Sequence, residues 1–183
     1  RWWFHQCMLN GSTEGMAMVD NVRVGEVVEA SAAEFVTQCH RLYEAPPLGA
    51  LVRCGIDSPV YGIVGDVATR SLDPGRRPMA VGENDESEDD VYKRNPQFMR
   101  LLSTEFRAVT VAHRENGLLL RYLPPSPPRI HAFVSRCDDE EMRDVSTNLD
   151  FLSVLLNASM TSQDDAIAAF LRQAGATRPD AEA

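Results

Sequence analysis

The four histidines are the side chains best suited to acid–base catalysis or metal binding near neutral pH. They are His5, His40, His113 and His131. His113 lies beside a predicted hairpin turn, and His131 begins a predicted strand after a proline-rich segment. Neither has a carboxylate or a cysteine at a spacing that forces the two side chains together. The histidines therefore define no catalytic or metal-binding pattern in the sequence.

The cysteines and serines show no nucleophile or ligand motif either. The cysteines are far apart and include no CxxC pair: Cys7, Cys39, Cys54 and Cys137. Because readable zinc sites need short ligand spacings, we expect free thiols that are buried or half-buried. No Gly-x-Ser-x-Gly motif is present. Ser31 is expected to bond to local backbone rather than to act as a nucleophile.

The distribution of charge excludes one large class of nucleotide-binding protein. Lys93 is the only lysine, so the chain has no glycine-rich loop that ends in Gly-Lys-Ser/Thr. The phosphate-binding lysine of a P-loop ATPase is therefore missing. Glu26 and Glu29 could lie close together on one strand, but a carboxylate pair needs a special environment before it can catalyse. We expect no enzyme activity and no cofactor.

The composition is that of an ordinary globular domain with an acidic balance. The 183 residues are 44% hydrophobic and 25% charged, and the formal net charge is -9. Such a charge disfavours nonspecific binding to nucleic acid or to an anionic membrane. No run of about 20 apolar residues is present. We expect a cytoplasmic location, because targeting signals are absent and the cysteines are unpaired.

The β-rich stretch 22–69 is the strongest indication of the fold. Short β-branched runs predict strands at 22–30, 34–39, 49–54 and 59–69, and turn residues separate them. The apolar phase slips after Gly25, which is typical of a bulge or a bent barrel strand. No helix-length segment lies between these strands, so the pattern favours an antiparallel barrel or sandwich over a parallel α/β fold.

Several segments of this stretch resemble a known family. They begin Val24-Gly25-Glu26-Val27, Glu34-Phe35-Val36, Pro47-Leu48-Gly49 and Tyr61-Gly62-Ile63. They resemble the HAS-barrel, the N-terminal barrel of HerA-type DNA-translocating ATPases and of rotary ATP synthase subunits. The resemblance covers roughly residues 22–135 and implies an assembly module without its ATPase domain. Its motif residues are structural: Gly25, Phe35, Gly49, Tyr61 and Gly62.

The region after the fourth strand predicts a loop, a helix and a hairpin. Residues 83–90 carry six carboxylates, which favour a solvated, mobile loop because they repel one another and lack the spacing of a calcium loop. Asn95-Pro96 predicts an N-cap and a short helix over 95–103. Strand patterns at 105–113 and 118–122 flank Asn116-Gly117, a strong hairpin signal.

A proline-rich segment separates this hairpin from the next predicted strand, at 130–135. Four prolines in five residues impose an extended backbone that cannot continue an internal ladder. One hypothesis is a crossover that straps the barrel closed. The other is a docking segment for an aromatic-lined groove of a partner, formed by Tyr122, Pro124, Pro125, Pro127, Pro128 and Arg129.

The C-terminal part of the chain has helical periodicity. Leucine and phenylalanine stripes predict two helices within 137–175, with Ser162 and Asp165 as a capping box and Gly175 as a C-cap. Residues 176–183 are expected to be a frayed tail, and residues 1–17 a disordered or non-native extension. The domain is thus expected to span 18–136, as a mainly β chain with a small antiparallel Greek-key-like barrel of about six to seven strands.

Three functions remain open at this point. The favoured one is a non-catalytic protein-interaction module that associates with itself or with a HerA-like ATPase. The second is a nucleic-acid-binding small barrel that acts with a DNA-processing ATPase. Its basic surface would be formed by arginines 53, 70, 76, 77, 94, 100 and 107. The third is a hydrolase or nucleotide-binding protein with an unfamiliar site.

Overall fold

The computed structural model describes residues 23–178 of the chain. Residues 1–22, with His5, Cys7 and the predicted extension, and residues 179–183 of the predicted tail lie outside this range. The strands in the described range are β1 (Arg23–Ala30), β2 (Glu34–Cys39), β3 (Leu51–Cys54), β4 (Val60–Ser71), β5 (Leu102–Glu115), β6 (Leu118–Leu120) and β7 (Phe133–Arg136). The helices are α1 (Glu88–Arg94), α2 (Phe98–Leu101), α3 (Asp139–Ser146), α4 (Leu152–Asn157) and α5 (Gln163–Ala176).

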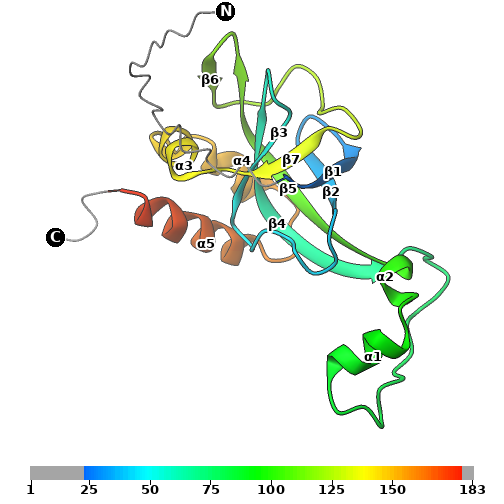
Figure 1. Ribbon diagram of the computed structural model, residues 1–183. Helices are drawn as coiled ribbons and strands as arrows, with labels where there is room; N and C mark the ends of the chain where they lie inside the picture. The colour runs from blue at the N-terminus through cyan, green and yellow to red at the C-terminus, as the bar shows by residue number, and fades with distance from the viewer. Residues whose placement is uncertain (1–22, 179–183) are drawn as a thin grey trace, which may run out of the picture.

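The strands form one antiparallel sheet whose pairings close into a ring. The order is β2-β1-β7-β3-β4-β5-β6, and β2 also pairs with β5. Six strands therefore follow one another around the ring, and β6 lies outside it as the second strand of a hairpin with β5 (Figure 1). The prediction of a mainly β chain with six to seven antiparallel strands and additional helices is confirmed.

Apolar side chains pack on both faces of the ring. One cluster takes buried residues from all six ring strands, including Val27, Phe35, Val52, Val64, Phe106 and Val134. The other cluster joins the outer faces of β3, β4 and β5 to α3, α4 and α5. The alternation along β5 shows the division, because Phe106 and Ala108 belong to the first cluster and Val109 and Val111 to the second.

The helices after β7 number three rather than the predicted two. The predicted capping box at Ser162 and Asp165 is wrong, because Ser162 precedes α5 without a side-chain cap. The capping box belongs instead to α3, where Asp138 accepts from the Glu141 N–H. Gly175 is not a C-cap either, since α5 continues to Ala176 and its cap is Thr177.

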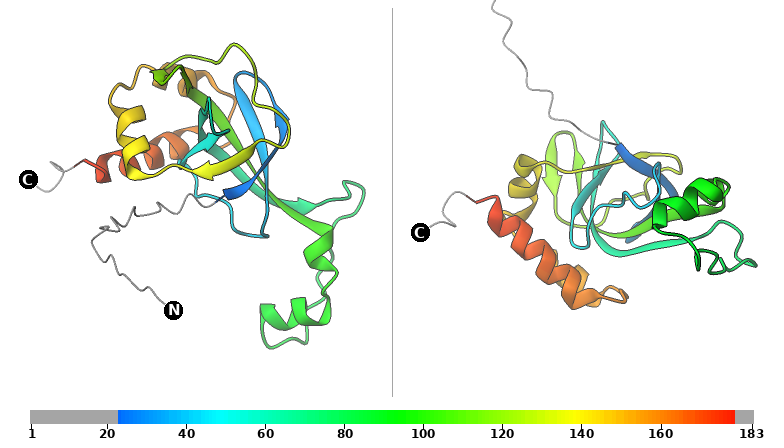
Figure 2. Two further views of the ribbon diagram at one scale, coloured as in Figure 1. Left: turned by 45° about the horizontal axis from the view of Figure 1, so that its top comes forward. Right: turned by 60° about the horizontal axis from the view of Figure 1, so that its bottom comes forward.

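Residues 72–101 form a lobe that projects from the sheet between β4 and β5 (Figures 1 and 2). The helix predicted over 95–103 is present as α2, but it covers only Phe98–Leu101, and the predicted N-cap at Asn95 is wrong. Ser87 caps α1 by accepting from the Asp90 N–H, and Asn95 is the C-cap of that helix. Three of the acidic residues expected in a loop lie in the first turn of α1, where a helix dipole stabilises carboxylates.

Strand ends differ from the predictions where the backbone turns. β3 begins at Leu51 because Gly49, with a φ of 76°, lies in the preceding turn. β7 begins at Phe133 rather than at residue 130, since His131 has a φ of 65°. The hairpin at Asn116-Gly117 is confirmed, with positive φ at both residues, although β6 ends at Leu120. Within residues 23–178, no helix has the length and apolar character needed to cross a membrane.

Candidate interaction surface and histidine sites

The motif residues behind the family resemblance occupy packing positions. Phe35 is 0% exposed in the cluster shared by the ring strands, and Tyr61 is 1% exposed on the helix-covered face. Gly62 makes room for Phe35, whose Cε1 would lie 2.9 Å from a Cβ at this position. Gly49 lies against α5, where a Cβ would be 2.6 Å from the backbone nitrogen of Phe170. These contacts explain the motif by packing.

A polar network at Tyr61 fixes α3 against the sheet. The Tyr61 hydroxyl donates to Glu141 Oε1 at 3.4 Å, and Arg114 Nε donates to the hydroxyl oxygen at 3.2 Å. Arg53 Nη1 donates to the same Glu141 oxygen at 3.0 Å. Burial raises the pKa of Tyr61, while the Arg114 hydrogen bond opposes this shift. The hydroxyl is therefore protonated at neutral pH and serves as a structural donor.

Two histidines that are distant in sequence meet one carboxylate on β1. His40 Nε2 lies 3.2 Å from Glu26 Oε1, and His131 Nδ1 lies 3.0 Å from Glu26 Oε2. Sequence spacing did not indicate this group, because it forms only when β2 and β7 both pair with β1. Within residues 23–178, no group of three or more histidine, cysteine, aspartate or glutamate side chains is arranged to hold a metal ion. The group is an exposed ion-pairing cluster.

Replacing Glu26 by glutamine is expected to remove a pH-dependent contribution to stability. Hydrogen bonds from His131 and then His40 lower the pKa of Glu26 below its ordinary value of 4.5. A lowered carboxyl pKa stabilises the fold above the unfolded-state value, and this contribution is lost as the pH falls through the folded-state value. Thermal unfolding of the two proteins should therefore differ near neutral pH and converge at acid pH, below the folded-state pKa of Glu26. Equal differences at both pH values would contradict the assignment.

His113 is buried beneath the proline-rich segment. It is 4% exposed, its Nδ1 lies 3.1 Å from the carbonyl oxygen of Tyr122, and its ring meets the Tyr122 ring edge-on. Its Nε2 has no hydrogen-bond partner among the described residues. A cavity of about 420 Å³ lies here, lined also by Asp57, Pro125 and Arg129. The contacts of His113 hold the start of the segment against β5.

The predicted docking residues differ in exposure. Pro124 and Pro128 are buried, whereas Tyr122, Pro125, Pro127 and Arg129 are exposed. The segment runs from β6 to β7 and so connects a strand outside the ring to one within it. The buried prolines suit a crossover that lies on the sheet. Docking through the exposed residues stays a prediction.

The described cysteines are free thiols with suppressed acidity. Burial raises the pKa of Cys54 to about 12 and that of Cys39 to about 11, the latter with a contribution from Glu105. Burial also raises the pKa of Cys137 well above its ordinary value. Because a thiolate is the nucleophilic form, none of these three is activated.

A groove on the lobe is larger than the cavity beside His113. This lobe groove has a volume of about 690 Å³ and lies between the 73–82 segment, α1 and α2. Its apolar lining includes Met79, Val81, Phe98 and Leu101, and Arg76 and Arg77 supply positive charge. Sequence reasoning missed it, although Met79 and Val81 are unusual apolar residues in a segment without strand or helix periodicity. The lining suits an apolar partner that carries negative charge.

Aromatic contacts fix the lobe to the sheet. Tyr92 of α1 meets Tyr43 edge-on and Phe98 likewise, each with ring centroids 6.2 Å apart. The Tyr43 and Tyr92 hydroxyls are hydrogen-bonded to each other, which raises the pKa of Tyr92 to about 12. The Tyr43 N–H donates to Thr104 Oγ1 at 2.8 Å, although its φ of 67° is unusual for a tyrosine. These contacts give the groove a defined floor.

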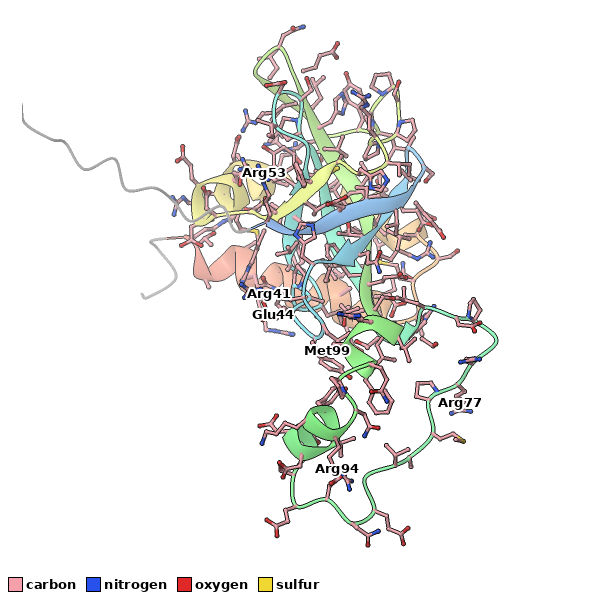
Figure 3. All side chains as sticks on the ribbon, turned by 45° about the vertical axis from the view of Figure 1, so that its right-hand side comes forward. Arg41, Glu44, Arg53, Arg77, Arg94 and Met99 are labelled. Carbon is pink, nitrogen blue, oxygen red and sulfur yellow. The ribbon has the colours of Figure 1, made fainter. Side chains whose placement is uncertain are left out.

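The arginines considered for nucleic-acid binding do not form one free basic stripe. Four of the seven pair with carboxylates: Arg53 with Glu141, Arg76 with Asp73, Arg94 with Asp85 and Arg107 with Glu34. Figure 3 shows Arg53 near the helices and Arg77 and Arg94 on the lobe. Arg53 is therefore separated from the arginines of the lobe.

The fold and the groove define a β-rich protein with an antiparallel, ring-like sheet, helices on one face and a projecting lobe. The chain matches no protein-family model, and comparison with curated proteins finds no match.

Proposed function

We propose that this chain is a non-catalytic assembly module that acts through protein–protein contacts. The observation that carries the proposal is the lobe, in which no residue is buried. Five large apolar side chains of the lobe are more than two-fifths exposed: Leu72, Met79, Val81, Met99 and Leu101. A cluster of exposed apolar groups is typical of an interaction site. Docking would remove this surface from water.

The resemblance to the HAS-barrel suggests what the partner is. The closed ring of six strands supports the interpretation of the sheet as a small Greek-key-like barrel. In the ATPases that carry such barrels, the barrel is joined to the ATPase domain, and this chain lacks a P-loop lysine. The proposed partners are therefore a second copy of the chain or a HerA-like ATPase.

Removing the lobe is expected to abolish association without unfolding the sheet. Ser71 pairs with Leu102 at the end of the β4–β5 ladder, so an Asn-Gly turn can join them in place of residues 72–101. Light scattering after size exclusion, alone and with a HerA-like ATPase, should show association of the full chain only. Ile56→Ser, which changes an apolar residue 76% exposed outside the lobe, serves as a control that should associate normally.

Two outcomes would contradict the proposal. A full chain that stays monomeric at all concentrations and does not bind the ATPase would exclude both proposed partners. Equal association of the full chain and the lobe-deleted variant would place the contact elsewhere. Circular dichroism of the variant checks that its sheet has formed.

A further inference from the structure

We propose that the lobe groove is a self-complementary interface between two copies of this chain. In a two-fold pair, the acidic tip of each lobe (residues 83–90) lies on the arginines of the other lobe's groove, and the apolar side chains pack between them. This inference rests on the proposed function, because it names the partner and the contact surface. It commits to a second copy as the occupant of the groove.

The apolar surface of the lobe provides the centre of the interface. Met79 is 81% exposed and Val81 44% exposed, and both line the groove together with Leu101, which is 47% exposed. Met99, two residues before Leu101, is 57% exposed, and Figure 3 shows it on the lobe. Methionine side chains are flexible and pack well at adaptable interfaces. Packing two such surfaces together would remove apolar area from water on both copies.

The charges of the lobe are separated along its length. The tip contains Glu83, Asp85, Glu86, Glu88, Asp89 and Asp90. Of these six carboxylates, Asp85 and Asp90 are paired within the lobe, with Arg94 and Lys93. The other four have no ion-pair partner among the described residues. The tip is therefore an exposed negative surface whose charge is largely uncompensated.

The positive charge lies on the groove and towards the sheet. Arg77 lines the groove and has no carboxylate partner within residues 23–178, while Arg76 has one exposed and loose contact, 3.5 Å from Asp73. Arg70 and Arg100 are exposed where the lobe joins the sheet and have no such partner in that range either. Figure 3 shows Arg77 on the segment that leads from the sheet towards the tip.

This separation of charge selects the relative orientation of the two copies. Two lobes side by side in the same direction would place tip against tip, and like charges in contact are strongly unfavourable. A two-fold axis perpendicular to the lobes reverses one of them, so each tip meets the other groove and the same contact is made twice. The chain as a whole carries a net charge of -9. Association of two such copies therefore needs a local pairing of this kind.

Charge reversal on either side of the contact tests the pairing. In the full chain, Arg76→Glu/Arg77→Glu makes the groove acidic, and Glu83→Arg/Glu86→Arg replaces two of the six tip carboxylates by positive charges. Sedimentation equilibrium of each variant alone should show a dimer dissociation constant raised by about tenfold or more. An equimolar mixture of the two should form a heterodimer within about threefold of the original dissociation constant, because the arginines introduced in one tip face the glutamates introduced in the other groove and the second contact is unchanged.

A matched control separates local pairing from overall charge. Arg136→Glu/Arg172→Glu changes two exposed arginines on β7 and α5, with the same change in net charge as the groove variant. Its dimer dissociation constant should stay within about threefold of that of the original chain. Added salt should weaken the original dimer, since exposed ion pairs are screened. Circular dichroism verifies that every variant is folded.

The outcomes distinguish this inference from the proposed function. If the chain self-associates and the groove variant does not weaken it, the interface is elsewhere and only the present inference fails. The same holds if the mixture of folded variants does not recover the heterodimer, or if the chain is monomeric but its lobe binds a HerA-like ATPase. Groove arginines that bind single-stranded DNA instead, with no dimer, would overturn the inference in favour of nucleic-acid binding. No association with either partner would overturn both proposals.

Discussion

Replacing Phe170 by alanine is expected to lower the free energy of unfolding by about 3–5 kcal/mol. Phe170 is 0% exposed and lies in the cluster that joins α5 to the outer face of the sheet. Its ring meets the Phe151 ring edge-on, with centroids 5.7 Å apart. Removing the ring leaves a cavity between α5 and the sheet that can close only if α5 moves toward the sheet. Urea denaturation followed by circular dichroism measures the change.

Leu171 provides the comparison for this prediction. It follows Phe170 in α5 but is 40% exposed, so Leu171→Ala should cost about 1 kcal/mol or less. If the two substitutions cost the same, α5 does not pack as described. The apolar stripes of the C-terminal helices do not by themselves specify which surface these helices cover. The burial of Phe170, Leu155 and Val145 shows that they pack on the sheet.

The strand pattern was predictable because each strand places apolar residues at regular intervals. β2 matched its predicted range, and the β1–β2 pairing shifts register between Val27 and Glu29, after Gly25 as the apolar pattern predicted. β5 was harder to delimit. The strand begins at Leu102, three residues before its predicted start. The reason is that Thr104 is buried beside Thr69 and Tyr43, which are distant in sequence.

The predicted helix boundaries were wrong where two local sequence signals competed. Asn95-Pro96 resembles a helix start, but the Asn95 N–H and side chain both donate to the Val91 carbonyl and so close α1. Ser87 was the competing signal, and its hydroxyl accepts from the Asp90 N–H. The run of carboxylates around Ser87 predicted a solvated loop, because like charges repel one another. Their stabilisation in the first turn of a helix was the stronger effect.

The candidate site could not be found from spacing alone. The groove is built from the 73–82 segment and from α1 and α2, and its floor includes Tyr43 from the β2–β3 connection. Similarly, Glu26 meets His131 across 105 positions of sequence. Contacts of this kind follow from the strand order, which no local pattern specifies. The role of Met79 also depends on its exposure. From the sequence alone, an apolar residue in a loop could lie in the core or on the surface, and only the structure shows that Met79 is exposed.

The second large effect is expected at Gly25, where the ring leaves no room for a side chain. A Cβ there would lie 2.1 Å from the carbonyl oxygen of Gln38 and 2.9 Å from Thr37 Cγ2. Gly25 pairs with Cys39 of β2 on one side and with Val134 of β7 on the other. An added methyl group must therefore push β2 away from β1. Gly25→Ala should lower the free energy of unfolding by about 3 kcal/mol, at the upper end of overpacking costs.

Gly175→Ala is the matched control and should act in the opposite direction. A Cβ at Gly175 meets no atom within 4 Å, and the residue lies in the last turn of α5. Alanine stabilises a helix relative to glycine, so this variant should gain about 0.5–1 kcal/mol. Urea denaturation of the two variants compares the same chemical change at a closed and an open position. A stable Gly25→Ala protein would show that β1 and β2 are not held together at this point, and the closed ring would have to be revised.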